Sequence, residues 1–117
     1  MRLTASCILG IMTSMPVAAV KPDIAMDLLR DCLDSSGEIV PGRHFREELV
    51  LENLTMADAW HVLRTGCIFD PPEIDIKTRE WKYRIEGNVP DGKDIAIVFS
   101  FKRVNSAYLI TVFSIGA

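Results

Sequence analysis

Residues 81–86 read Trp-Lys-Tyr-Arg-Ile-Glu, so that large apolar side chains alternate with charged ones at every position. Successive side chains of a β-strand point to opposite faces, and this alternation therefore predicts a strand with one buried and one exposed face. We place the strand at residues 80–86, with Trp81, Tyr83 and Ile85 inward and the charged side chains outward.

The segments around this strand predict an antiparallel meander. Pro90-Asp91-Gly92 is a typical turn sequence, and residues 95–101 and 108–115 are apolar on both faces, as central strands are. Residues 103–106 join these two strands, a connection short enough for a hairpin. Upstream, residues 67–69 predict a further short strand, closed by two prolines.

The first half of the chain has helical periodicity instead, with apolar residues three and four positions apart. Three segments show this pattern: residues 23–34, 43–52 and 56–65. A short connecting strand is expected at residues 38–40, Thr55 and Asp58 have the spacing of a capping box, and Asn53 is a typical helix stop. Helices followed by strands predict one α+β domain over residues 21–117, with two to three helices packed on one face of a three- to four-stranded antiparallel sheet.

The composition excludes several classes of protein. A chain of 117 residues is the size of one ordinary domain, and 49% hydrophobic residues are enough for a core. With 13 Lys+Arg against 16 Asp+Glu, the net charge of −3 is too small for a disordered acidic chain and has the wrong sign for a general nucleic-acid binder. The three cysteines lack metal-ligand spacing, and we expect neither a metal nor a cofactor.

Residues 1–20 precede the domain and have two interpretations. A charged start, a short apolar run and small residues are typical of a signal peptide, whereas a start at Met12 or Met15 would make the segment a misassigned extension. The run is too short and too polar to span a membrane. We expect a cytoplasmic domain with free thiols, or, if a signal peptide is present, an exported one in which Cys32 and Cys67 can pair.

Four segments form a family pattern through their order and spacing. They are the first helix with the short strand that ends at Arg43-His44, the helix that residues 54–59 introduce and residues 63–66 end, the strand at residues 81–87, and residues 109–113. Together they extend over about residues 22–115, nearly the whole domain. The pattern resembles a bacterial domain of unknown function (DUF4258-like), related in layout to the RelE-, MqsR- and BrnT-type ribonuclease toxins. The resemblance implies a RelE/BrnT-like fold, metal-independent cleavage of RNA and an antitoxin protein as partner.

The chain departs from this family at two charged positions. The family typically has arginines four and eight residues after the histidine, whereas this chain has Glu48 and Glu52 there. If those arginines contact phosphate, this chain has lost the contact. The departure gives a second hypothesis, a non-catalytic protein-interaction domain on the same scaffold.

RNA cleavage without a metal needs an acid/base and cations that stabilise the charged transition state. His44, at the start of its helix, is the candidate acid/base, because imidazole titrates near neutral pH; alternatively it caps its helix or hydrogen-bonds to the sheet. Arg43 and Arg46 complete the expected catalytic set. Cations of the strands, with a threonine that the family often has, form the expected substrate-binding set: Lys82, Arg84, Lys102, Arg103 and Thr111.

The two hypotheses predict different surroundings for His44. An enzyme requires the imidazole exposed in a groove within reach of at least two cations. An interaction domain predicts that His44 is buried or paired with a carboxylate. Independently of either hypothesis, Lys82 and Arg84 have the alternative interpretation of ordinary ion pairs with Glu or Asp neighbours across strands.

Overall fold

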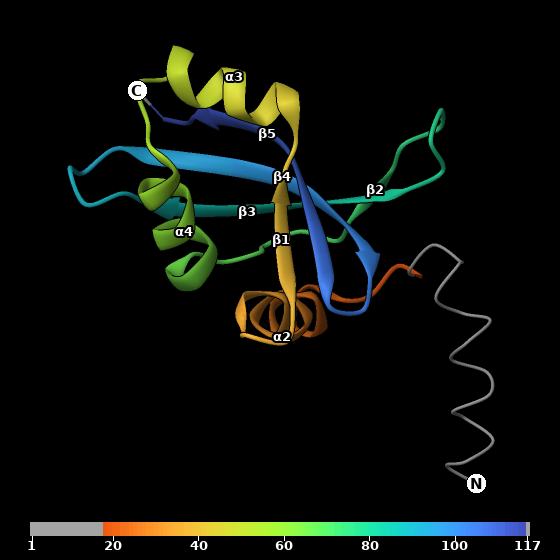
Figure 1. Cartoon of the computed structure of the whole chain (residues 1–117). Coiled ribbons are helices and arrows are strands. Elements are labelled where there is room, and N and C mark those ends of the chain that lie inside the picture. Colours follow the sequence, from red (N-terminus) through yellow and green to blue (C-terminus); the bar gives the residue numbers. More distant parts are fainter. Residues whose placement is uncertain (1–17, 117) are drawn as a thin grey trace, which may run out of the picture.

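The computed structural model describes residues 18–116, so the expected signal peptide or extension lies almost entirely outside the described residues. Three helices and five strands follow in the order α2 (Pro22–Leu33), β1 (Glu38–Pro41), α3 (Arg43–Leu51), α4 (Met56–Thr65), β2 (Glu73–Ile74), β3 (Trp81–Asn88), β4 (Asp94–Arg103) and β5 (Ser106–Ser114) (Figure 1). The α+β class is confirmed, and each predicted helix is correct to within one residue at either end.

The sheet is larger than predicted and mixed rather than antiparallel. Its strand order is β1-β5-β4-β3-β2, in which β1 runs parallel to β5 and the other neighbours are antiparallel. The prediction of three to four antiparallel strands is therefore wrong, because β1 and β2 are too short for their sequences to show which strand they join. Residues 67–69 are not a strand either, since Cys67 makes only an isolated bridge to Glu86.

The core lies between one face of the sheet and the three helices. Buried side chains of β3, β4 and β5 form one cluster with those of α2, α3 and α4, and α3 contributes Phe45 and Leu49. The Tyr83 ring lies 5.6 Å from Phe99 and 5.2 Å from Phe101, centroid to centroid, and its hydroxyl accepts a hydrogen bond from the Val20 N–H at 3.0 Å. Tyr83 and Ile85 point inward as predicted, which leaves Lys82 and Arg84 on the outer face.

Helix α3 takes a different place from the one expected, because it lies along the edge of β5 (Figure 1). β1 pairs with β5 only as far as Leu109. There the Gly42 N–H donates to the Leu109 carbonyl at 2.9 Å, and α3 continues alongside the rest of β5. A Cβ on Gly42 would lie 2.9 Å from the Leu109 carbonyl oxygen of the backbone, so the close approach of β1 and β5 requires a glycine at this position.

The predicted ends of α3 and α4 are confirmed. Asn53 has a φ of 60°, the left-handed conformation that stops a helix. The Thr55 hydroxyl accepts from the Asp58 N–H at 3.2 Å, and the Asp58 carboxylate accepts from the Thr55 N–H at 2.9 Å. This reciprocal pair is the capping box that the spacing predicts.

Two further findings concern the cysteines and the character of the helices. Cys32 and Cys67 are both free thiols, so the bridge expected of an exported chain is not formed. Within residues 18–116, the helices lack the length and apolar character that crossing a membrane requires.

Candidate functional site

Glu48 of α3 and Glu52, the C-cap residue that follows α3, bind the part of β5 that β1 does not cover. Glu48 Oε1 accepts from the Val112 N–H at 3.0 Å and from the Thr111 hydroxyl, while Glu52 Oε1 accepts from the N–H and hydroxyl of Ser114 at 3.2 and 2.6 Å. Four residues of helix and two residues of strand both advance by about 6–7 Å, which lets the two side chains reach alternate amides. Glu48 and Glu52, which stand where the family resemblance leads us to expect arginines, therefore occupy the hydrogen-bonding edge of β5.

His44 lies one turn before Glu48 on the same flank of α3. Its Nε2 is 3.3 Å from Glu48 Oε2, and 69% of the imidazole is exposed against 24% of the Glu48 side chain. The carboxylate thus stands between the imidazole and the Thr111 hydroxyl. In a Ser-His-Asp set the imidazole is central and takes the hydroxyl proton, so this order does not activate Thr111 as a nucleophile.

The arginines expected to complete the catalytic set are not gathered around His44. Arg43 donates through Nε to Glu47 at 3.3 Å, forming an exposed ion pair. Arg46 follows His44 by two residues and therefore projects about 160° away from it around the helix axis. Helix α3 places these three side chains in different directions.

The outer face of the sheet does bring three expected substrate-binding residues together. Arg84, Val98 and Thr111 are direct neighbours across β3, β4 and β5, and Lys82 lies on the same face of β3. These four residues line a hollow of about 380 Å³, a volume typical of small-ligand pockets. The loop between α4 and β2, with β2 itself, completes its rim through Asp70, Pro71 and Glu73.

Carboxylates outnumber the cations around this hollow. Lys82 Nζ lies 2.8 Å from Asp75 Oδ2, and Arg84 Nε lies 2.8 Å from Glu86 Oε2. The rim adds two further carboxylates, Asp70 and Glu73. Binding of a polyanion depends on cations that are free to neutralise phosphates, and both cations of the hollow are already matched by carboxylates.

Lys102 and Arg103, also expected to bind substrate, lie at the end of β4 and do not line the hollow. Lys102 pairs with Glu80, and its Nζ is 5.0 Å from the centre of the Tyr108 ring. Arg103 pairs with Glu38 of β1 at 3.0 Å. Both side chains tie neighbouring segments to the sheet.

Residues 73–82, which we name the arm, form a structure that the sequence pattern did not reveal. β2 pairs only with Trp81 and Lys82, so the arm extends beyond the sheet on the side opposite α4 (Figure 1). Asp75, which directly follows β2, is the polar residue around which its loop is arranged. An aspartate whose carboxylate accepts from the N–H groups two and three residues later forms an Asx-turn. The aspartate at position 75 is therefore the one signal in the sequence that could have revealed this loop.

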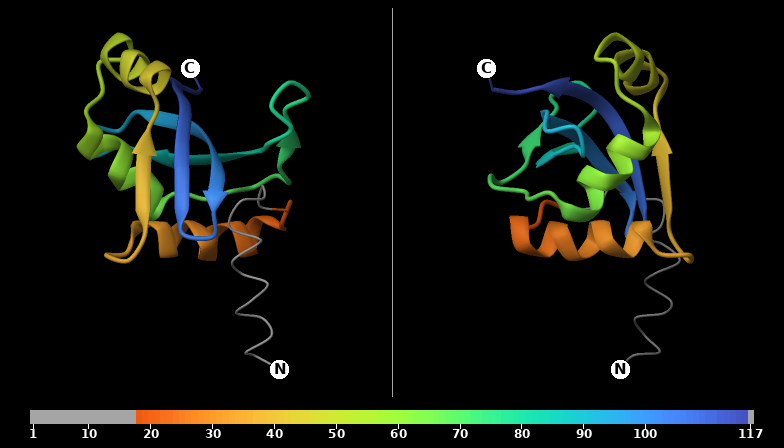
Figure 2. Two further views of the ribbon diagram at one scale, coloured as in Figure 1. Left: turned by 45° about the vertical axis from the view of Figure 1, so that its right-hand side comes forward. Right: turned by 90° about the vertical axis from the view of Figure 1, so that its left-hand side faces the viewer.

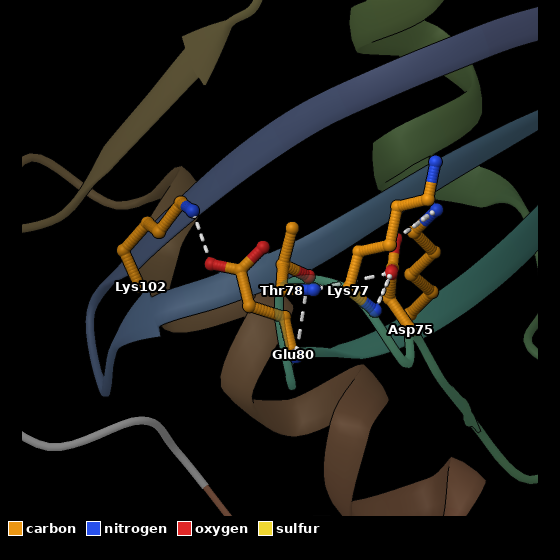
Figure 3. A network of polar contacts seen from close by, with 6 residues as sticks. Asp75, Lys77, Thr78, Glu80 and Lys102 are labelled. Atoms are coloured by element: carbon orange, nitrogen blue, oxygen red, sulfur yellow. Dashed lines mark hydrogen bonds and ion pairs between the residues drawn. The ribbon is translucent and has the colours of Figure 1, made fainter.

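The Asp75 carboxylate holds the loop of the arm in place. It pairs with Lys82 and accepts from the N–H groups of Lys77 at 2.9 Å and Thr78 at 3.3 Å (Figure 3). The hydrogen bond from Lys82, then those from Thr78 and Lys77, lower the pKa of Asp75 below its usual value. Glu80, at the other end of the loop, pairs with Lys102 and so fastens the arm to β4 (Figure 3).

Within residues 18–116, no group of three or more His, Cys, Asp or Glu side chains is placed to hold a metal ion.

Comparison with known proteins assigns the chain to a family. Neither the curated proteins nor the solved structures give a significant match. Residues 42–114, from the start of α3 to the end of β5, match a family model described as Domain of unknown function (DUF4258). Because this match covers more than half of the 117 residues, the chain belongs to the DUF4258 family.

Proposed function

We propose that this protein is a non-catalytic protein-interaction domain. The observation that carries the proposal is the role of Glu48 and Glu52, whose carboxylates bind the backbone of β5 and, through Glu48, the imidazole of His44. A side chain engaged in closing the sheet edge is not available to a substrate, and its negative charge opposes the approach of a phosphate.

The distribution of the cations supports the same proposal. Cleavage of RNA needs cations aimed at the phosphorane as its charge develops. Arg43, Lys82, Arg84, Lys102 and Arg103 each make an ion pair with a carboxylate of this chain. Only Arg46 of the expected cations makes no ion pair within the described residues, and it projects away from His44.

A second candidate function is a RelE/MqsR/BrnT-type ribonuclease toxin, with RNA as substrate and an antitoxin as partner. The exposed imidazole of His44 favours it, because Glu48 holds Nε2 and leaves the other ring nitrogen accessible as an acid/base. Thr111, whose hydroxyl donates to Glu48, would then bind phosphate beside the hollow. Arg84 would bind it as well, from the same face of the sheet, with β4 between its strand and that of Thr111.

Cleavage of RNA in solution separates the two candidates. We would incubate the purified full chain and its His44→Ala variant with a fluorescently labelled single-stranded RNA in the presence of EDTA. The interaction proposal predicts the same cleavage rate for both proteins, equal to that of a blank. Cleavage by the natural chain that His44→Ala abolishes would overturn it and establish the ribonuclease.

We further propose that the domain acts in the cytoplasm. Free thiols are the usual state of cysteine in a reducing compartment, and Cys32 and Cys67 are both free. Mass determination of the chain isolated from its own cells tests this location. Cleavage after the small residues that end near position 19 would contradict it.

A further inference from the structure

We propose that the arm, residues 73–82, is the docking element of this domain, and that it binds a protein partner whose apolar groove carries carboxylates at its rim. This inference rests on the proposed function and names the surface and the partner chemistry. Figure 2 shows the arm standing apart from the three helices, where a partner can reach it from several sides.

The tip of the arm exposes apolar side chains. Ile76 is 83% exposed and Ile74 is 47% exposed, although isoleucine is among the residue types most often buried. Single exposed apolar residues are common on protein surfaces. These two, however, lie two positions apart on the arm, Ile74 at the end of β2 and Ile76 in the loop that follows. An apolar anchor of this kind is what a complementary groove on a partner would bury.

The same tip carries cations that the fold does not use. Within residues 18–116, no carboxylate lies within ion-pair distance of Lys77 or Arg79, whereas Lys82 and Lys102 at the base of the arm are both paired. Opposite charge around an apolar contact steers association and suppresses wrong partners. The groove that fits Ile76, which Lys77 and Arg79 closely follow in the chain, therefore has an acidic rim.

The loop is fixed before any partner arrives. Besides the bonds made by the Asp75 carboxylate, the Asp75 N–H donates to the Glu80 carbonyl at 2.8 Å and the Arg79 N–H donates to the Asp75 carbonyl at 2.7 Å. Arg79 has a φ of 65°, an unfavourable conformation for a residue other than glycine. A binding element that is already ordered loses little conformational freedom on docking, which favours affinity.

The number of cations distinguishes a protein partner from a membrane or RNA. Recognition of anionic membranes rests on clusters of about four to eight Lys and Arg residues, and RNA affinity also grows with the number of phosphates neutralised. The tip offers two, Lys77 and Arg79, beside two isoleucines. This ratio fits an apolar groove with an acidic rim.

Site-specific photo-crosslinking in the cells that naturally contain the chain tests the inference. The apolar crosslinker p-benzoylphenylalanine replaces Ile76, or, as matched exposed apolar positions elsewhere, Leu51 at the end of α3 (82% exposed) or Val104 in the β4–β5 turn (57% exposed). We expect one discrete protein adduct from position 76 and none from positions 51 and 104. The partner protein in the adduct is then identified by mass spectrometry. We expect its crosslinked surface to be an apolar groove with carboxylates at the rim.

Charge reversal supplies the second measurement. Lys77→Glu combined with Arg79→Glu should reduce the yield of the adduct at least fivefold, whereas Arg46→Glu, which reverses an exposed cation on α3, should leave it unchanged. Circular dichroism of each purified variant shows that it is folded. Equal adduct yields from the natural charges, the double variant and Arg46→Glu would overturn the proposal that the partner's groove has an acidic rim.

The remaining outcomes separate a failure of the arm from a failure of the proposed function. A discrete adduct from position 51 or 104 but not from 76 overturns the arm and leaves the interaction domain standing. The absence of an adduct from positions 51, 76 and 104 alike overturns both the docking role of the arm and the proposed interaction function. Binding of the purified chain to phosphatidylserine vesicles or to single-stranded RNA, lost in the double charge reversal, overturns the protein partner and assigns the arm to that ligand instead.

Discussion

Glu48 joins two elements of the molecule through one carboxylate, since it belongs to α3, pairs with His44 of the same helix and binds two groups of β5. Removing it leaves the Val112 N–H and the Thr111 hydroxyl without their acceptor in a partly buried place. We expect Glu48→Ala to lower the free energy of unfolding by about 1–3 kcal/mol, the usual effect of orphaning buried donors.

The matched control is Glu47→Ala, which removes the neighbouring carboxylate from its exposed pair with Arg43. Exposed ion pairs stabilise proteins by less than about 1 kcal/mol, so this variant should unfold close to the natural chain. Urea unfolding followed by circular dichroism measures both variants. Equal destabilisation by the two substitutions would show that Glu48 does not hold the edge of β5.

Arg79 is the second residue with a testable energetic consequence, because its φ of 65° is unfavourable for any side chain with a Cβ. Arg79→Gly removes that penalty, offset in part by the greater freedom of glycine in the unfolded chain. We expect a net gain in unfolding free energy of about 0.5–1 kcal/mol. Lys77→Gly, at a position without positive φ, should give no gain; a gain from both would indicate another cause.

At the scale of the elements, local signals predicted the helices and the short strand at residues 38–40, which is β1 to within one residue, but they missed β2. Periodicity and the capping box between Thr55 and Asp58 act within a few residues, so the sequence shows them directly. The parallel pairing of β1 with β5 joins segments far apart in the chain, and neither four-residue β1 nor two-residue β2 has a pattern long enough to name its partner.

The arm gives a pH prediction at this scale. The pKa of Asp75 lies below its usual value of 3.8 in the folded chain, so its bonds stabilise the loop fully above that value and are lost as the pH falls through the lower, folded-state pKa. We expect the amide NMR signals of Lys77 and Thr78 to shift only in this acidic range. In Asp75→Asn that transition should be absent; its persistence would assign it to another group.

At the scale of the whole molecule, the two thiols report on how the chain is packed. Burial, with the nearby charges of Asp31 and Glu38, raises the pKa of Cys32 to about 12, whereas Cys67 is exposed. A Cys7→Ser variant retains only these two cysteines. A chromogenic disulfide reagent at pH 8 should therefore label one thiol quickly in the folded protein and both in denaturant, because the thiolate is the reactive form. Rapid labelling of both thiols in the folded protein would contradict the packing of α2.

The candidate site shows where sequence reasoning reaches its limit. Alternation along β3 placed Lys82 and Arg84 on the outer face, and they do share a hollow with Thr111. The sequence could not show that Glu48 and Glu52 bind β5, because that contact depends on α3 lying at the sheet edge. Nor could it show that Lys82 pairs with Asp75, Lys102 with Glu80 and Arg103 with Glu38, since each of these pairs joins residues from different elements.

The proposal that this domain does not cleave RNA is tested most directly by growth. Bacteria induced to make the natural chain are compared with bacteria making His44→Ala, with soluble, folded protein verified in both cultures. We predict equal, unimpaired growth, because His44 is paired with Glu48, Arg43 and Arg84 are paired with other carboxylates, and Arg46 projects away from His44. Growth arrest by the natural chain, relieved by His44→Ala, would contradict this prediction and identify a His44-dependent toxin.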